Sequence, residues 1–148
     1  MKKFILMLVT LVTIGSGAAF AKDEETVNQQ VLNSFKQEFA DARDVSWQTN
    51  REFVKATFTL NDQVMFAFYS QTGDLLAITR NISSDKLPIS LLTGLKKNYS
   101  EFWITDLFEM VAGGGSTYYV TVQNADVEVV LKSNEFGSWE VYKKSKKA

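Results

Sequence analysis

Hydrophobic side chains recur every four residues in one early segment of the chain, which is the spacing of one face of an α-helix. The repeating positions are Val27, Val31, Phe35 and Phe39. Thr26 and Gln29 have the spacing of a capping box, in which each side chain satisfies a backbone amide of the first turn. The pattern predicts a helix over about residues 26–41, with the apolar stripe facing a core.

A second helix is predicted from Asp85 to Tyr99. Its apolar stripe is Ile89, Leu92, Leu95 and Tyr99. Pro88 lies in the first turn, where the amide that proline lacks has no partner in any case. From both helices we expect Phe35, Phe39, Phe58, Leu92 and Leu95 to be core residues at the interface of helices and sheet.

After each helix the period of the hydrophobic positions changes to two, which is typical of strands with one buried face. The strands expected are 53–60, 63–70, 75–81, 102–110, 116–123, 126–133 and 138–143. A further strand forms if Val45-Ser46-Trp47 also pairs. The sequence therefore predicts an α+β fold, with two helices packed on one face of an antiparallel sheet of about eight strands.

The two halves of the chain repeat the same order of elements. Phe39 aligns with Tyr99 at a separation of 60 residues, and Gly73 aligns with Gly137 at a separation of 64. The difference between these two separations falls in the stretch that contains Gly113-Gly114-Gly115. We therefore predict a duplicated helix-plus-antiparallel-meander, with repeats over about residues 26–81 and 85–144.

Short structural motifs suggest a family. They are Val45-Ser46-Trp47 after the first helix, Tyr69-Ser70-Gln71-Thr72-Gly73 at a hairpin and Leu87-Pro88 at the start of the second helix. With these motifs the chain resembles the PepSY-like family of small secreted bacterial proteins, which is similar in fold to the beta-lactamase-inhibitor protein. The resemblance implies two helices against an antiparallel sheet whose open face binds a protein or peptide.

The first 21 residues have the features of a secretory signal peptide. They comprise Lys2-Lys3, an uncharged run over 4–21 and a terminal Ala19-Phe20-Ala21. Gly15-Ser16-Gly17 interrupts the apolar run after about a dozen residues, whereas a membrane anchor needs about 20. We expect cleavage after Ala21, a single domain over 22–148 without an integral membrane segment, and a periplasmic or secreted location.

Composition excludes several functions. Residues 22–148 contain 14 basic and 17 acidic side chains, a net charge of −3, so nucleic acid is not an expected partner. The basic cluster Lys143–Lys147 is expected to be a solvated tail, with loose attraction to an anionic surface as the alternative. The chain has no histidine and no cysteine. Histidine-dependent hydrolases and histidine-ligated zinc sites are therefore excluded.

The remaining catalytic patterns are weak. Gly113-Gly114-Gly115-Ser116 lacks the Gly-Lys-Ser/Thr ending of a phosphate-binding loop, and a strand is expected after it in place of a helix. Asp106 and Glu109 lie at positions of one strand that face opposite ways, so they do not form an acid–base pair. We expect no enzyme, no cofactor and no metal site.

Aromatic residues are expected on both faces of the sheet. If Val54, Ala56 and Phe58 face the helices, alternation sends another set of aromatic side chains to the opposite face. That set is Phe66, Phe68, Tyr119 and Tyr142. A sheet covered on one side should be polar on the other, so exposed aromatic residues there indicate a binding surface. The alternative is that a partner subunit or the curvature of the sheet covers this face.

We therefore predict that these four aromatic residues meet a protein or peptide partner. The corresponding function is a secreted or periplasmic, non-enzymatic binding module that resembles an inhibitor. The alternative function is a structural or assembly component of the cell envelope. Both readings leave the oligomeric state and the identity of the partner open.

Overall fold

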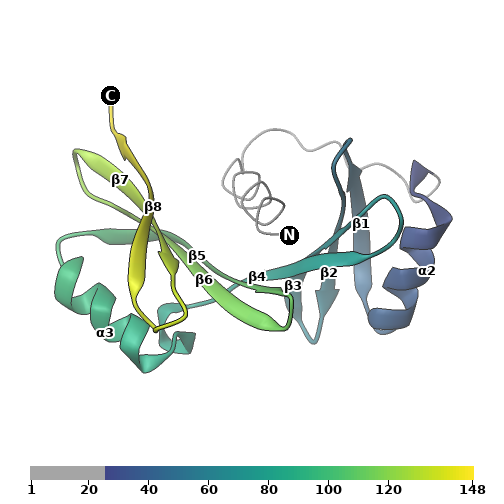
Figure 1. The fold of residues 1–148 in the computed structure, drawn as a ribbon, viewed down its shortest axis with the longest axis horizontal. Coiled ribbons are helices and arrows are strands. Elements are labelled where there is room, and N and C mark those ends of the chain that lie inside the picture. The colour runs from purple at the N-terminus through teal and green to yellow at the C-terminus, as the bar shows by residue number, and fades with distance from the viewer. Residues whose placement is uncertain (1–25) are drawn as a thin grey trace.

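The computed structural model describes residues 26–148, which form two α-helices and one open sheet of eight antiparallel strands (Figure 1). The first half consists of α2 (Gln29–Glu38), β1 (Arg43–Thr49), β2 (Val54–Leu60), β3 (Gln63–Tyr69) and β4 (Leu75–Asn81). The second half consists of η2 (Ser84–Lys86), α3 (Ile89–Asn98), β5 (Trp103–Ala112), β6 (Gly115–Gln123), β7 (Val127–Ser133) and β8 (Trp139–Lys146). The predicted signal peptide, residues 1–21, lies outside the described residues.

Each strand pairs with the next one along the chain, so the sheet is a continuous meander whose edges are β1 and β8. Short connections suffice for antiparallel neighbours, and only β4 and β5 are joined by a longer segment, which contains η2 and α3. The prediction of an α+β fold with two helices and an eight-stranded antiparallel sheet is confirmed. The segment at 45–47 does pair, as part of β1.

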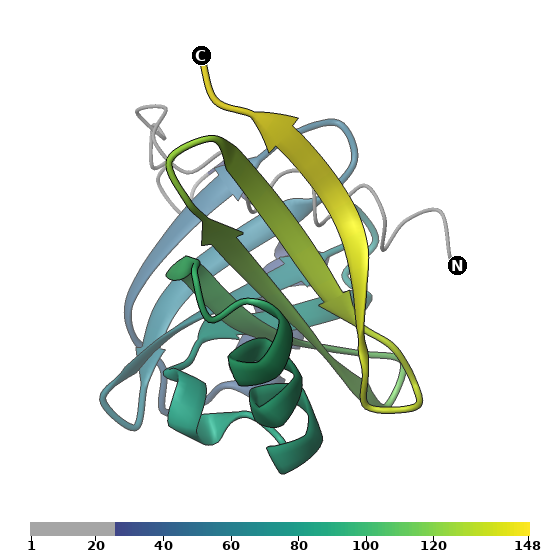
Figure 2. The same ribbon diagram turned by 90° about the vertical axis from the view of Figure 1, so that its left-hand side faces the viewer.

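Both helices lie on the same face of the sheet. Ile78 of β4 packs with the residues around α2 and pairs with Val111 of β5. Leu107 lies four residues before Val111, on the same face of β5, and packs with the residues around α3. The helices cover the two ends of this face, α2 over the first half and α3 over the second (Figures 1 and 2).

Phe35 of α2 is the centre of the first core. Its ring contacts those of Phe39, Trp47 and Phe58 at centroid distances of 5.4, 5.1 and 5.0 Å. The predicted stripe of this helix is buried throughout. Trp47 and Phe58 meet the Phe35 ring edge to face, whereas Phe39 is tilted against it, and such aromatic pairs add to the stability gained from burial alone.

The predicted start of the first helix is wrong. Asn28 is the N-cap, and its Oδ1 accepts a hydrogen bond from the Gln30 amide at 2.7 Å. The Asn28 side chain also donates to the carbonyl of Gln71 in the β3–β4 hairpin. This second bond joins residues distant in sequence, so a local capping pattern such as Thr26–Gln29 could not reveal it.

The second helix follows its predicted stripe only in part. Leu91 and Leu95 are buried and Leu92 is partly buried, whereas Ile89 is 78% exposed. Pro88 is the N-cap and does not lie in the first turn. The face that points to the sheet is set by Trp139 of β8, whose Nε1 donates to the carbonyl of Leu91 at 2.8 Å.

One further expectation, a strand after the glycine run, is confirmed by β6, and another changes in the structure. Gly113 and Gly114 form the tight turn of the β5–β6 hairpin, with φ of 59° and 80°, values that glycine adopts without steric cost. Lys143, Lys144 and Lys146 lie in β8, so the basic cluster is not a solvated tail. Pairing with β7 holds this segment in the sheet.

Candidate functional site

The face of the sheet opposite the helices carries its own hydrophobic cluster, which we call the helix-free cluster. Its buried members are Phe53, Phe68, Ala77, Phe108, Met110 and Tyr119, and Phe66, Leu76, Ala112 and Tyr142 pack against them partly buried. They come from β3, β4, β5, β6, β8 and the turn before β2. Among the described residues, none from α2 or α3 belongs to it.

Strand register explains why these side chains meet. Phe68 pairs with Ala77 of β4, and Phe108 pairs with Tyr119 of β6. Directly paired residues point to the same face of a sheet. The Phe108 and Tyr119 rings stack at 5.1 Å with an interplanar angle of 13°, and Tyr142 contacts Tyr119 edge to face at 5.9 Å.

The structure places Phe66, Phe68, Tyr119 and Tyr142 on the same face and within this cluster, but not at the same depth. Phe68 and Tyr119 are each only 1% exposed, whereas Phe66 and Tyr142 are partly buried. The expectation that all four are exposed is therefore wrong for Phe68 and Tyr119. Both pack among the other members of the helix-free cluster, which come from the sheet and the turn before β2, and we call these two buried residues the floor of the cluster.

Two lysines complete the surface of the helix-free cluster. The Nζ atom of Lys55 lies 4.6 Å from the ring centroid of Phe66 and 5.7 Å from that of Phe68. The Nζ atom of Lys132 lies 5.9 Å from the centroid of Tyr119. A cation over an aromatic face is attracted by the electrons of the ring. Partial burial lowers the pKa of Lys55, because its charged form loses hydration.

Lys55 and Lys132 were not predicted as members of this surface. A usable signal existed, since the two-residue turn Asn61-Asp62 sets the β2–β3 register and places Lys55 opposite Phe68. Lys132 pairs with Tyr119 across β6 and β7. Counting back from each hairpin would have paired each lysine with its aromatic neighbour.

The two acidic residues of β5, Asp106 and Glu109, do not face one another. Asp106 pairs with Thr121, and Glu109 pairs with Tyr118, so the two carboxylates point to opposite faces as expected. Burial raises the pKa of Asp106, and the side chain of Asn81 donates a hydrogen bond to its Oδ1 atom. Within residues 26–148, no three acidic side chains cluster in a way that could hold a metal ion.

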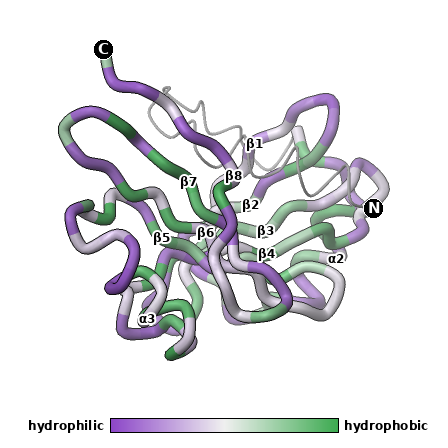
Figure 3. The backbone as a smooth tube through the Cα atoms, turned by 60° about the vertical axis from the view of Figure 1, so that its left-hand side comes forward, coloured by the Kyte–Doolittle hydropathy of each residue, from purple (hydrophilic) through white to green (hydrophobic). Residues whose placement is uncertain are grey.

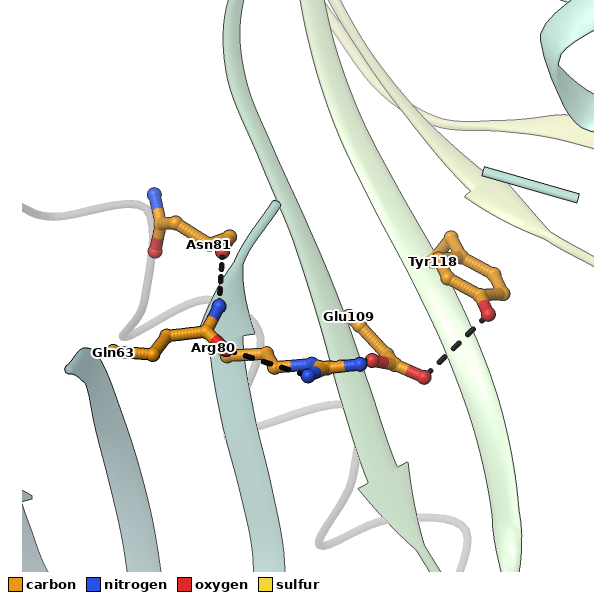
Figure 4. A network of polar contacts seen from close by, with 5 residues as sticks. All are labelled: Gln63, Arg80, Asn81, Glu109 and Tyr118. Atoms are coloured by element: carbon orange, nitrogen blue, oxygen red, sulfur yellow. Dashed lines mark hydrogen bonds and ion pairs between the residues drawn. The ribbon is translucent and has the colours of Figure 1, made fainter. Parts of the chain in front are cut away.

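A polar network fills the space between the two helix-covered cores (Figure 4). Arg80 donates from Nε to Glu109 at 2.7 Å, and the Tyr118 hydroxyl donates to the other carboxylate oxygen at 3.5 Å. Gln63 joins the network through Arg80 and through the carbonyl of Asn81. The Glu109 side chain is only 10% exposed, so its charge needs these partners. The network joins β3, β4, β5 and β6, and we assign it to stability.

No family model matches the chain, and no curated protein matches it significantly. Several solved structures share its fold. A DUF2874 family protein from Bacteroides ovatus has 17% identity and a TM-score of 0.71, with 82% of this chain and 88% of that chain covered. A BLIP-like protein from Bacteroides fragilis has 17% identity and a TM-score of 0.69, with 84% and 92% covered.

A proposed periplasmic protein from Bacteroides eggerthii has 10% identity and a TM-score of 0.71, with 81% of this chain and 88% of that chain covered. At such low identities the likeness concerns the fold alone. The chain therefore has the fold of a BLIP-like protein, and none of the three descriptions names an enzyme. Among the described residues, no helix is long and apolar enough to cross a membrane.

Proposed function

We propose that the protein is an exported, non-enzymatic binding module that meets a protein or peptide partner on its helix-free cluster. The observation that carries this proposal is an aromatic cluster on the one sheet face that neither α2 nor α3 covers, with Phe66 and Tyr142 partly exposed. Aromatic side chains are enriched among the residues that dominate binding energy at protein interfaces. The BLIP-like fold of a structural neighbour is consistent with an inhibitor-like role.

The four aromatic residues have different roles because they are buried to different depths. Phe66 and Tyr142 are partly exposed and can contact a partner directly, together with the ammonium groups of Lys55 and Lys132. Phe68 and Tyr119 are buried, and the Tyr119 ring contacts that of Tyr142 edge to face. A rigid floor reduces the entropy that the surface residues lose when a partner binds.

Site-specific photo-crosslinking in the exporting cell tests the proposal. A photoreactive amino acid at Phe66 or at Tyr142 should capture one discrete partner. The same amino acid at Phe136, which is 82% exposed and lies outside the helix-free cluster, should not capture it. In binding assays with that partner, Phe66→Ala and Tyr142→Ala should each weaken association by about 1 kcal/mol or more, while Phe136→Ala should not. Equal capture at all three positions would contradict the proposal.

The open edges of the sheet favour a second candidate, a structural or assembly component of the cell envelope. Val141 of the edge strand β8 is 60% exposed, and unpaired edge strands can add a strand from another chain. Analytical ultracentrifugation separates the two functions. An assembly component should form oligomers as its concentration rises, and Val141→Lys should abolish them, whereas a binding module should stay monomeric.

We also propose that the fold arose by internal duplication, in keeping with the resemblance to the PepSY-like family. Gly73 and Gly137 support this, because each ends a hairpin in a positive-φ conformation against the first turn of the helix of its own half. A side chain at Gly73 would meet the carbonyl of Gln30, and one at Gly137 would meet Ser90, both at 2.9 Å. Gly73→Ala and Gly137→Ala should therefore both destabilise the protein.

A further inference from the structure

The lysines near the C-terminus are held on the sheet. Lys143, Lys144 and Lys146 are exposed residues of β8, and the amide of Lys147 donates to the carbonyl of Asp126 at 2.8 Å. Figure 3 shows this end of β8 as a hydrophilic segment next to the hydrophobic strands of the second half. Lys143 pairs with Val130 in the middle of β7, whereas Lys146 and Lys147 lie at the end of the sheet, so the four charges have defined positions along the last part of the chain.

Two exposed apolar residues lie at the same end. Trp103 is 51% exposed and Ile104 is 44% exposed, at the start of β5. The register runs from Trp103 through Gln123 and Glu128 to Ser145, so the start of β5 and the end of β8 share one end of the sheet. The Nζ atom of Lys147 lies 5.2 Å from the centroid of the Trp103 ring.

An apolar hollow extends this surface toward α3. It has a volume of about 250 Å³, and its lining includes Leu92, Leu95, Lys96, Tyr99, Phe102 and Ile104. Ile104 lies at the junction of the exposed patch and the hollow, and Lys96 adds a fifth exposed ammonium group. We call the four lysines of the C-terminal segment, Lys96, Trp103 and Ile104 together the basic tip.

Charge is distributed unevenly over the molecule. The basic tip has five lysines, with Glu101, Asp126 and Glu128 as the neighbouring acidic residues, a local net charge of +2. Residues 26–148 have 13 basic and 14 acidic side chains, so the remainder of the described chain has a net charge of −3. An anionic surface would attract the basic tip and repel the rest, which would orient the protein.

We propose that the basic tip docks the exported protein on an anionic membrane surface. Tryptophan favours the interface between water and lipid, and exposed lysines are attracted to the phosphates of anionic lipids. Stable attachment at a membrane surface generally needs an apolar contact and a basic patch together, and the basic tip has both. An anionic polymer would use the lysines but would leave Trp103 and Ile104 without a function. This inference uses no residue of the helix-free cluster, so the two proposals can fail separately.

Vesicle flotation with the exported chain tests the inference, after mass measurement has established its N-terminus. The protein should float with vesicles of equal parts phosphatidylglycerol and phosphatidylcholine. It should not float with vesicles of phosphatidylcholine alone, and high salt should release it because salt screens the charges. Flotation on both kinds of vesicle, or on neither, would overturn the inference.

Substitutions locate the contact. The pair Lys146→Gln and Lys147→Gln should lower the vesicle partition coefficient about tenfold or more, as should Trp103→Ala. Arg51→Gln, an exposed basic position in the first half, and Phe136→Ala are the matched controls and should leave partitioning unchanged. Equal losses in the control variants would overturn the assignment to the basic tip.

Tryptophan fluorescence gives a second readout that misfolding cannot imitate. Trp47 is 4% exposed, and Trp139 is held by its hydrogen bond to Leu91, so Trp103 should be the tryptophan that senses lipid. Emission should shift to shorter wavelength when anionic vesicles are added, and Trp103→Phe should remove the shift. A shift that persists in Trp103→Phe would contradict insertion at this position.

Discussion

Tyr119 tests whether the helix-free cluster has a buried floor. The ring is 1% exposed, stacks on Phe108 at 5.1 Å and contacts the edge of Tyr142 at 5.9 Å. Tyr119→Ala would remove the ring and leave a cavity in the centre of the cluster. Truncation of a buried large aromatic side chain costs about 3–5 kcal/mol of unfolding free energy. Tyr119 lies in β6, which pairs with a strand on each side, so little relaxation can fill the space.

Urea denaturation, monitored by tryptophan fluorescence, measures this loss of unfolding free energy. With a urea dependence of about 2 kcal/mol per molar, the midpoint should fall by roughly 1.5–2.5 M. Tyr119→Phe is the matched control, because it keeps the stacked ring and should change stability by only about 1 kcal/mol. A midpoint in Tyr119→Ala within about 0.3 M of the wild type would refute the buried floor. It would instead support an exposed Tyr119, as the sequence analysis expected.

Further predictions concern substitutions at single positions, the pH dependence of stability and the site of cleavage. Phe39→Ala should cost about 2–5 kcal/mol of unfolding free energy in chemical denaturation, and an unchanged midpoint would show that the helix register is wrong. Burial raises the pKa of Tyr119 above its ordinary value of 10.0, so the folded state keeps a proton that the unfolded chain releases. Stability should therefore fall as the pH rises above about 10, and Tyr119→Phe should lessen that fall in denaturation series across alkaline pH. Gly137→Ala should destabilise more than Gly113→Ala, because both have positive φ but only the former lacks room for a Cβ atom. Mass spectrometry of the exported protein should show cleavage after Ala21, and intact residues 1–21 would contradict that prediction.

Local sequence patterns determined most of the secondary structure. The four-residue spacing of Val31, Phe35 and Phe39 set the buried side of α2, since a helix brings such positions onto one face. The two-residue alternation did the same for each strand, because the pleat sends successive side chains to opposite faces. Short connections between consecutive strands within each half then made an antiparallel meander the expected order.

Tertiary structure alone decided features that depend on contacts between distant segments. Asn28 caps α2 while it also bonds to Gln71, and Trp139 sets the face of α3 through Leu91. Neither contact leaves a local pattern, because its partners lie 43 and 48 residues apart in the chain.

The candidate binding surface was likewise determined in part by local sequence and in part by tertiary structure. Strand alternation alone sent Phe66, Phe68, Tyr119 and Tyr142 to one face, since parity along a strand is a local property. Their depths were decided by how the strands of both halves curve toward one another, which buries Phe68 and Tyr119 and leaves the other two partly exposed. Curvature is a property of the whole sheet and cannot be read from alternation within one strand.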